Sequence, residues 1–125
     1  MKSRFNGIAP QFVVPDVVRT AEYYRDKLGF EILGYFLDPP VFAMVRRGVA
    51  EIHIGKSDTG EMQVNENVRR GLGTDAYIFV DRINELYAEL LANEVEIIEG
   101  PIKRIYDCVE ITIRDCNGFR LVFGE

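Results

Sequence analysis

The sequence of 125 residues is poor in the side chains that hold transition metals. It has one histidine, His53, two cysteines, Cys108 and Cys116, and no tryptophan. Structural zinc sites use four cysteine and histidine ligands, so this chain has too few for such a site. Any bound metal would depend on carboxylates, and two cysteines do not predict a disulfide framework.

The sequence also lacks long apolar runs and an excess of basic residues. No run approaches the roughly 18 apolar residues of a membrane span, and "MKSRFNGIAP" has no apolar core of a signal peptide. With 15 lysines and arginines against 20 acidic residues, the net charge is −5, and the basic pairs are scattered along the chain. We therefore expect no nucleic-acid partner, no membrane partner and a cytoplasmic location.

Eight short segments have strand-like patterns, and two longer segments have helix-like patterns. The strand candidates are "PQFVV", "FEILGYF", "VFAMV", "AEIHIG", "DAYIFV", "VEII", "CVEITI" and "FRLVFG". They alternate apolar and polar residues or are rich in β-branched and aromatic residues. Helices are predicted in "DVVRTAEYYRDKLGF", with Asp16 as N-cap and Gly29 as C-cap, and in "DRINELYAELLANEV", with Asp81 as N-cap.

The two halves of the chain repeat one pattern. Aligning Asp16 with Asp81 also aligns Ile32 with Ile97, and the segment "AEIHIGK" matches "FRLVFGE" in the same order. A duplicated unit of one strand, one helix and three strands explains this better than chance similarity of amphipathic elements. We predict a single domain over residues 1–125, with repeat one at about 5–56, a linker at about 57–74 and repeat two at about 75–125.

Several motifs carry a resemblance to a known family. They are Val14-Pro15-Asp16, the pair Tyr23-Tyr24, Leu28-Gly29-Phe30 and the closing segment "DCNGFRLVFGE". Together they resemble the vicinal oxygen chelate superfamily, which includes glyoxalase I, extradiol dioxygenases and bleomycin-resistance proteins. The chain departs from the family's "DPDG" turn at Cys116 and Asn117. The resemblance, closest to bleomycin-resistance-like members, implies an α+β fold in which two βαβββ repeats form a curved, cleft-bearing mixed sheet.

Strand alternation divides each predicted strand into two faces. One face is aliphatic, as at Ile52 and Ile54, and is expected to pack on a helix. The other face is mixed. A solvated sheet face would also be polar, but aromatic residues among the polar ones favour a small-molecule cleft. The candidate ligand-binding residues are Gln11, Tyr35, Phe42, Glu51, His53, Asp75, Tyr77, Phe79, Tyr106, Glu110 and Arg120.

A metal site can be tested by position. The resemblance carries the four ligand positions of metal-dependent relatives onto Ala9, His53, Asp75 and Val122. Alanine and valine offer no lone pair, so only His53 and Asp75 are candidate metal ligands, and a catalytic ion needs three or four protein ligands. A slip in strand register could add Gln11 or Glu110. We expect no metal cofactor, and a His53 that lines the pocket with Asp75 or Glu51 as its hydrogen-bond partner.

These features predict a metal-free small-molecule-binding protein of the bleomycin-resistance and glyoxalase-like type. It would sequester a small aromatic or cationic ligand in a cleft, because acidic groups attract a cation and aromatic rings stack on flat molecules. The alternative is a metal-dependent glyoxalase-like lyase, isomerase or dioxygenase; no catalytic residue is assigned, and whether the chain is an enzyme stays open. A third alternative is an interaction module whose Tyr77 and Phe79 are covered by another chain. The resemblance also implies a homodimer.

Overall fold

Residues 1–125, all described by the computed structural model, form two modules of one topology. The first module contains β1 (Gln11–Val14), α1 (Val17–Leu28), β2 (Glu31–Phe36), β3 (Phe42–Arg47) and β4 (Ala50–Lys56). The second contains β5 (Ala76–Phe79), α2 (Ile83–Ala92), β6 (Glu96–Lys103), β7 (Val109–Arg114) and β8 (Arg120–Gly124). The prediction of an α+β fold with two βαβββ repeats is therefore confirmed.

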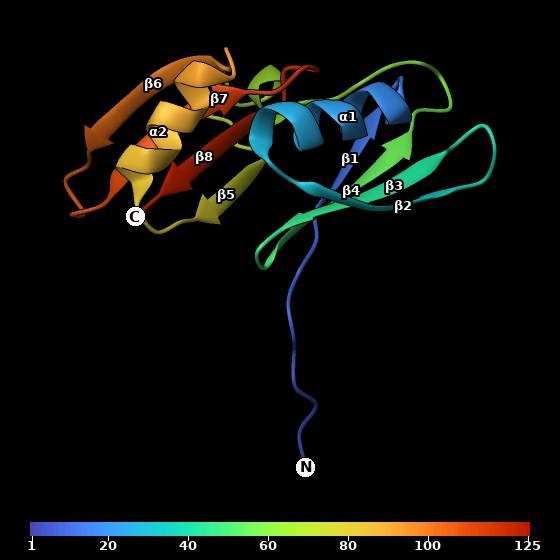
Figure 1. The fold of residues 1–125 in the computed structure, drawn as a ribbon, viewed down its shortest axis with the longest axis horizontal. Helices are drawn as coiled ribbons and strands as arrows, with labels where there is room; N and C mark the ends of the chain where they lie inside the picture. Colours follow the sequence, from blue (N-terminus) through green and yellow to red (C-terminus); the bar gives the residue numbers. More distant parts are fainter.

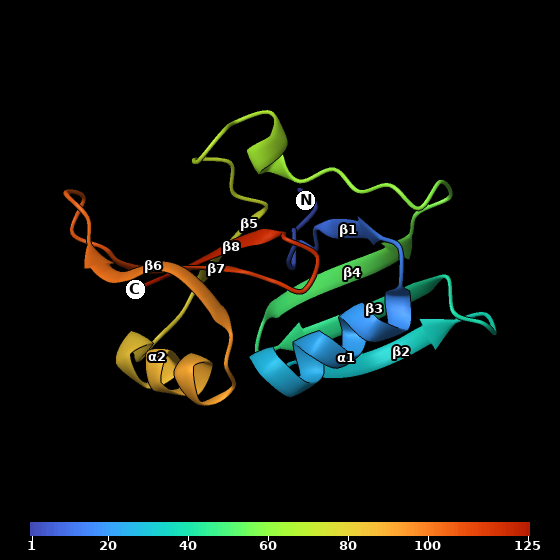
Figure 2. The same ribbon diagram turned by 90° about the horizontal axis from the view of Figure 1, so that it is seen from above.

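Each module has its own four-stranded mixed sheet, in the orders β1-β4-β3-β2 and β5-β8-β7-β6. The first strand of each module pairs in parallel with its last strand, and the remaining pairs are antiparallel. The two sheets stand side by side, and both helices lie on the same side of them (Figures 1 and 2). The surface expected of one curved sheet is thus divided between two sheets.

Strand alternation places aliphatic side chains against the helices. Ile52 and Ile54 of β4 are buried in one core cluster with Tyr24 of α1. Burying such a side chain contributes roughly 1.5–3 kcal/mol each. The modules also contact each other directly: the rings of Phe12 and Phe119 stack with centroids 4.3 Å apart. These contacts position the two sheets relative to each other.

The two helices begin differently, although both follow an aspartate. Asp16 caps α1 as predicted, because its Oδ1 accepts a hydrogen bond from the backbone nitrogen of Arg19 at 3.0 Å. The prediction that Asp81 caps α2 is wrong. The cap position is Arg82, which has a left-handed φ of 60° and makes no side-chain cap. The Glu125 carboxylate accepts instead from the backbone nitrogens of Arg82 and Ile83, at 2.9 and 3.0 Å.

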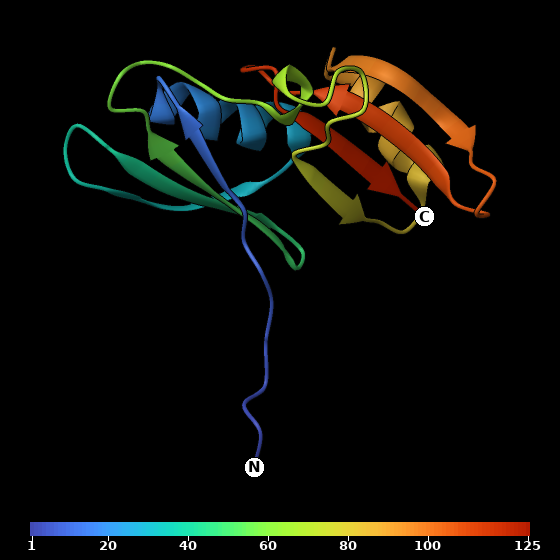
Figure 3. The ribbon, with the colours of Figure 1, turned by 180° about the vertical axis from the view of Figure 1, so that it is seen from behind.

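Two segments lie outside the sheets and helices of the modules. Residues 57–75 connect β4 to β5 and include the short 3-10 helix η1 (Asn65–Asn67). Residues 1–10 extend from the start of β1 away from both modules (Figures 1 and 3). Neither α-helix has both the length and the apolar character that crossing a bilayer requires.

Candidate functional site: the open sheet faces

The candidate site lies on the sheet faces that point away from the helices, which we call the open faces. Paired residues of neighbouring strands share a face, and Met44 pairs with His53 across β3 and β4. The open face of module 1 consists of Gln11, Val13, Phe36, Phe42, Met44, Arg46, Glu51 and His53. Several of these side chains are accessible: Val13 is 43% exposed and Phe36 is 61% exposed.

His53 lies near the centre of this open face and has a carboxylate partner. Its Nε2 is 2.6 Å from Oε2 of Glu51, so the structure selects Glu51 over Asp75 as the hydrogen-bond partner. The Phe42 ring meets the imidazole edge-on, with centroids 5.4 Å apart. The side chains of His53 and Glu51 are each 29% exposed. An aromatic ring, an imidazole and a carboxylate therefore stand together on a half-open surface.

The structure places Tyr35 on the opposite side of β2 from the candidate site. A β-bulge between Ile32 and Gly34 shifts the pairing, so that Tyr35 faces Ala43 on the helix side and Phe36 pairs with Phe42. An extra residue in a strand reverses the faces of all residues that follow it. Tyr35 therefore does not share a face with the other candidate residues of module 1, whereas its neighbour Phe36 does. The glycine at position 34 is the one sequence signal of the bulge.

The open face of module 2 is closed by its own side chains. Glu110 is 5% exposed and lies on this face where β7 begins, opposite Gly124 of β8. Its carboxylate accepts hydrogen bonds from Tyr77 Oη at 2.7 Å, from Arg104 Nε at 2.9 Å and from Tyr106 Oη at 2.9 Å. Arg104 also bonds Glu99 on the neighbouring strand β6. Two predicted site residues, Tyr77 and Tyr106, thus cover the third, Glu110.

Hydrogen bonding decides the ionisation of this cluster. Burial raises the pKa of Glu110, but the hydrogen bonds from Tyr77, Arg104 and Tyr106 outweigh burial and hold its pKa below the ordinary value. The pKa of Tyr77 is raised by burial and by its contacts with Cys108 and Glu110. Glu110 is therefore a stable carboxylate at neutral pH, and its charge is already compensated inside the chain.

Two further contacts hold the open face of module 2 shut. The Tyr77 hydroxyl lies over Gly124, where a Cβ atom would come within 1.9 Å of the oxygen, so a side chain at this position would displace the Tyr77 ring. At the other end the linker crosses the face: Arg120 donates to the Gly71 carbonyl at 2.7 Å, and Glu66 accepts from Arg120 at 3.3 Å. The buried positions beneath these contacts are Thr112, 1% exposed, and Val122, 7% exposed.

The four metal-ligand positions do not fit a divalent ion. Ala9 and Val122 carry no donor atoms, and both oxygens of Asp75 accept backbone hydrogen bonds, from Asn65 at 3.0 Å and from Arg120 at 2.9 Å. His53 makes its hydrogen bond to Glu51 instead. No group of three or more histidine, cysteine, aspartate or glutamate side chains is placed to share an ion. Asp75 thus ties the linker to β8.

The predicted site residues do not gather in one cavity. Gln11 and Asp75 line a polar cavity of about 480 Å³ between β1, the linker and the start of β5. Phe79 shares the open face of module 2 with Tyr77 and also borders an apolar groove between the modules. The others lie on the two open faces, except Tyr35. The candidate residues do not include Phe36, Met44 and Arg104. The facing of Phe36 depends on the bulge, and Arg104 reaches the face from a loop without periodicity.

Comparison with known proteins identifies the family of the chain. Residues 4–123 match the sequence profile of the Glyoxalase/Bleomycin resistance protein/Dioxygenase superfamily. The chain belongs to this superfamily, as its motifs predicted, whereas the bleomycin-resistance-like subgroup is not distinguished by this match. No curated protein sequence matches the chain significantly.

Solved structures share the fold at low sequence identity. TioX from Micromonospora sp. ML1 superposes with a TM-score of 0.78 at 13% identity, covering 97% of this chain and 98% of TioX. A glyoxalase-related enzyme from Clostridium phytofermentans gives a TM-score of 0.77 at 16% identity over 98% and 96% of the two chains. Lactoylglutathione lyase from Agrobacterium tumefaciens gives 0.73 at 18% identity over 99% and 96%. These similarities define the fold and no activity.

Proposed function

We propose that the chain binds a small aromatic molecule on the open face of module 1, without a metal ion and within a cytoplasmic homodimer. The observation that carries the proposal is the accessible surface formed by Phe36, Phe42 and the Glu51–His53 pair. Flat ligands bind on aromatic surfaces that include a few placed polar groups. The superfamily binds small molecules, which fits such a surface.

The contacts of the three carboxylates reduce the range of ligands that fits the surface. We propose an aromatic ligand that carries at most one positive or hydrogen-bond-donating group. Of the three carboxylates expected to attract a cation, Glu110 is compensated by Arg104 and Asp75 is bonded to two backbone nitrogens. Only Glu51 remains partly exposed, and it is hydrogen-bonded to His53. The ligand therefore gains its affinity mainly from ring contacts, with Glu51 and His53 fixing its orientation.

Lyase chemistry of the glyoxalase type is not proposed for this chain. One structural relative is named lactoylglutathione lyase, and the superfamily's metal-dependent members hold their ion at four positions. In this chain those positions supply one carboxylate that is already bonded to backbone and one histidine bonded to Glu51. A set of that kind does not fix the geometry of a Lewis-acidic ion.

Calorimetric titration with a panel of flat probes tests the proposal. The panel contains neutral 2-naphthol, anionic 2-naphthoate, cationic ethidium and bleomycin, so that ring contacts and charge are separated. We expect measurable binding of at least one probe, and roughly fivefold weaker binding after Phe36→Ser, because a ring contact of about 1 kcal/mol is lost. The matched control is Tyr35→Ser, which removes the adjacent aromatic from the helix side of the same strand and should leave affinity unchanged.

Two outcomes count against this function. If no probe of the panel gives heat, the aromatic-ligand proposal has no support. If Tyr35→Ser and Phe36→Ser weaken binding equally, the ligand does not lie on the open face of module 1.

A further inference from the structure

The open face of module 1 carries an arginine that forms no ion pair within the chain. Arg46 lies near the end of β3 and is exposed. In the strand register it stands opposite Glu51 of β4 and opposite Glu31 of β2. Opposed residues of antiparallel strands have their Cβ atoms about 5 Å apart, which is close enough for an ion pair. Arg46 nevertheless joins none of the ion pairs of the chain, and Glu51 bonds His53 instead.

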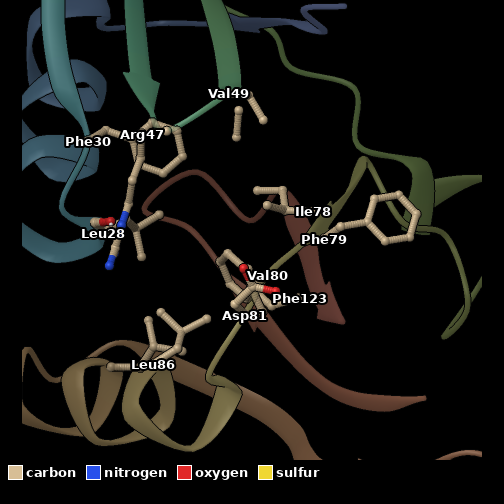
Figure 4. Close-up of a pocket in the computed structure, with 13 residues that line it drawn as sticks. Leu28, Phe30, Arg47, Val49, Ile78, Phe79, Val80, Asp81, Leu86 and Phe123 are labelled. Carbon is tan, nitrogen blue, oxygen red and sulfur yellow. Dashed lines mark hydrogen bonds between the residues drawn. The ribbon is translucent and has the colours of Figure 1, made fainter. Parts of the chain in front are cut away.

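The next residue, Arg47, has the opposite arrangement. It lies on the helix side of β3 and lines the apolar groove between the modules (Figure 4). Its Nη1 is 2.5 Å from Oε2 of Glu89 and donates to the Leu28 carbonyl oxygen at 2.9 Å. The charge of Arg47 is therefore compensated within the chain. Of the two adjacent arginines, only Arg46 is available to an anion from outside.

Arg46 and Glu51 border the same polar pocket. The pocket has a volume of about 530 Å³ and lies between residues 6–9 and the β3–β4 hairpin. Only three of its eight lining residues are hydrophobic, and Glu31 is not among the eight. Its volume is within the range of small-molecule sites. The pocket offers one cation and one anion, so a group that carries both charges is matched there.

Glu51 has an oxygen left for such a group. Its Oε2 lies 2.6 Å from Nε2 of His53, whereas its Oε1 makes no hydrogen bond in the chain. The Glu51 side chain is partly exposed, so a ligand reaches that oxygen. An ionised carboxylate oxygen with free lone pairs accepts readily from an ammonium group.

The aromatic part of the open face begins one step along the strands from these charges. Residues that share a face on one strand are roughly 7 Å apart. The pair Met44–His53 follows the charged pair, and Phe42, which pairs with Phe36, follows Met44. The order along the face is therefore two opposite charges, then a thioether and an imidazole, then two rings. An aromatic α-amino acid has a corresponding order: an ammonium and a carboxylate on one carbon atom, a methylene group and a flat ring.

We propose that the ligand of the open face of module 1 is an aromatic α-amino acid, whose carboxylate binds Arg46 and whose ammonium group binds Glu51. This inference rests on the aromatic ligand proposed above and adds Arg46 as the residue that determines specificity for a carboxylate. The ring of the ligand then lies over Met44 towards Phe42. Such a ligand carries one positive group and is neutral overall, so both of its charges are paired on the surface.

Calorimetric titration with three ligands that share one ring tests the inference. The amino acid 3-(2-naphthyl)-L-alanine carries both charges, 2-(2-naphthyl)ethylamine lacks the carboxylate, and 3-(2-naphthyl)propionate lacks the ammonium group. We expect the amino acid to bind about tenfold more tightly than either of the others, because each of them loses one charge-assisted hydrogen bond.

Substitution of Arg46 identifies the partner of the carboxylate. Arg46→Gln changes an exposed side chain without an ion pair, so it should fold as the wild type does. It should weaken binding of the amino acid and of the propionate about tenfold and leave the amine unchanged. The matched control is Arg47→Gln, which removes the same charge from the next residue on the other side of the strand and should leave all three affinities unchanged.

Substitution of Glu51 should give the complementary result. Glu51→Gln should weaken binding of the amino acid and of the amine and leave the propionate unchanged, because only the partner of the ammonium group is lost. The matched control is Glu31→Gln, which removes the carboxylate on the other side of Arg46, outside the pocket. It should not weaken the binding of any of the three ligands.

The outcomes separate this inference from the proposed function. If Arg46→Gln weakens all three ligands equally or none of them, Arg46 is not the partner of the carboxylate and the inference is overturned. An amine that binds the wild type as tightly as the amino acid overturns it too. In either case, affinity that falls with Phe36→Ser leaves the aromatic ligand proposed above intact. Absence of heat from all three ligands overturns the inference, and the proposed function fails only if 2-naphthol and the other flat probes give no heat either.

Discussion

On module 1 the open-face carboxylate Glu51 meets His53 and stays partly exposed. On module 2 the open-face carboxylate Glu110 is buried beneath Tyr77, Arg104 and Tyr106. The two modules share one topology, although Glu51 lies on β4 and Glu110 lies on β7, so strand order alone does not explain the difference in exposure. It comes from the connections: the β6–β7 loop brings Arg104 and Tyr106 over the sheet, and the linker covers the other end.

A duplicated fold therefore supplies two equivalent sheet faces, and loop side chains decide which of them can accept a ligand. On the open face of module 2 the polar groups bond one another, because a buried carboxylate without partners would be strongly unfavourable. The open face of module 1 keeps an imidazole, a carboxylate and two aromatic rings available. This contrast is the reason for assigning the ligand to module 1.

The largest expected effect comes from removing the carboxylate that closes module 2. Glu110→Ala leaves Tyr77, Arg104 and Tyr106 without their shared acceptor, and we expect the free energy of unfolding to fall by about 3 kcal/mol. Glu51→Ala removes the open-face carboxylate of module 1. It should lower the free energy of unfolding by less than about 1 kcal/mol, because the Glu51–His53 pair is partly solvated. Urea unfolding measures both. Equal losses of unfolding free energy would contradict the account in which the open face of module 2 is closed and that of module 1 is accessible.

Removal of the Asp75 carboxylate, which joins the linker to β8, should have the next largest effect. Asp75→Ala deletes the hydrogen bonds that two backbone nitrogens donate to its two carboxylate oxygens, and we expect a loss of about 2 kcal/mol in unfolding free energy. The control is Asp81→Ala, because Asp81 makes no cap on α2 and should change stability by less than about 0.5 kcal/mol. A stability loss at Asp81 that matched the loss at Asp75 would contradict the structural role given to Asp75.

The pH dependence of stability sharpens the comparison further. The folded-state pKa of Glu110 is below its ordinary value, so its ionised form stabilises the fold at neutral pH. That contribution is present above the ordinary glutamate pKa and is lost as the pH falls through the lower folded-state value. The stability difference between wild type and Glu110→Gln should therefore shrink from pH 7 towards pH 3 in urea titrations. A difference that grew with acidification would have the wrong sign.

The smallest expected effect is that of metal ions. Dialysis against a chelator, followed by addition of Ni²⁺, Zn²⁺ or Mn²⁺, should leave the melting temperature unchanged, because no complete ligand set exists. His53→Ala should show the same indifference. A stoichiometric ion that raises the melting temperature in the wild type and fails to do so in His53→Ala would restore the alternative of a metal-dependent enzyme.

The sequence was sufficient for the fold because the pattern repeats. Asp16 as helix cap and the aliphatic faces at Ile52 and Ile54 follow from local spacing alone. The site was harder, because its decisive features depend on long-range contacts. The bulge before Gly34 reversed the faces of Tyr35 and Phe36. Arg104 reaches Glu110 from a loop, and no strand pattern places a loop side chain on a sheet.

The methyl signals of the methionines give the most direct test of the ligand surface. Met44 pairs with His53 on the open face of module 1, whereas Met62 lies in the linker and Met1 at the start of the chain. In ¹³C-methyl-methionine protein, titration with the tightest-binding probe of the panel should shift Met44 in proportion to occupancy and leave Met1 unmoved. A saturating probe that shifts Met62 or Met1 while Met44 stays fixed would place the ligand elsewhere and contradict the assignment to module 1.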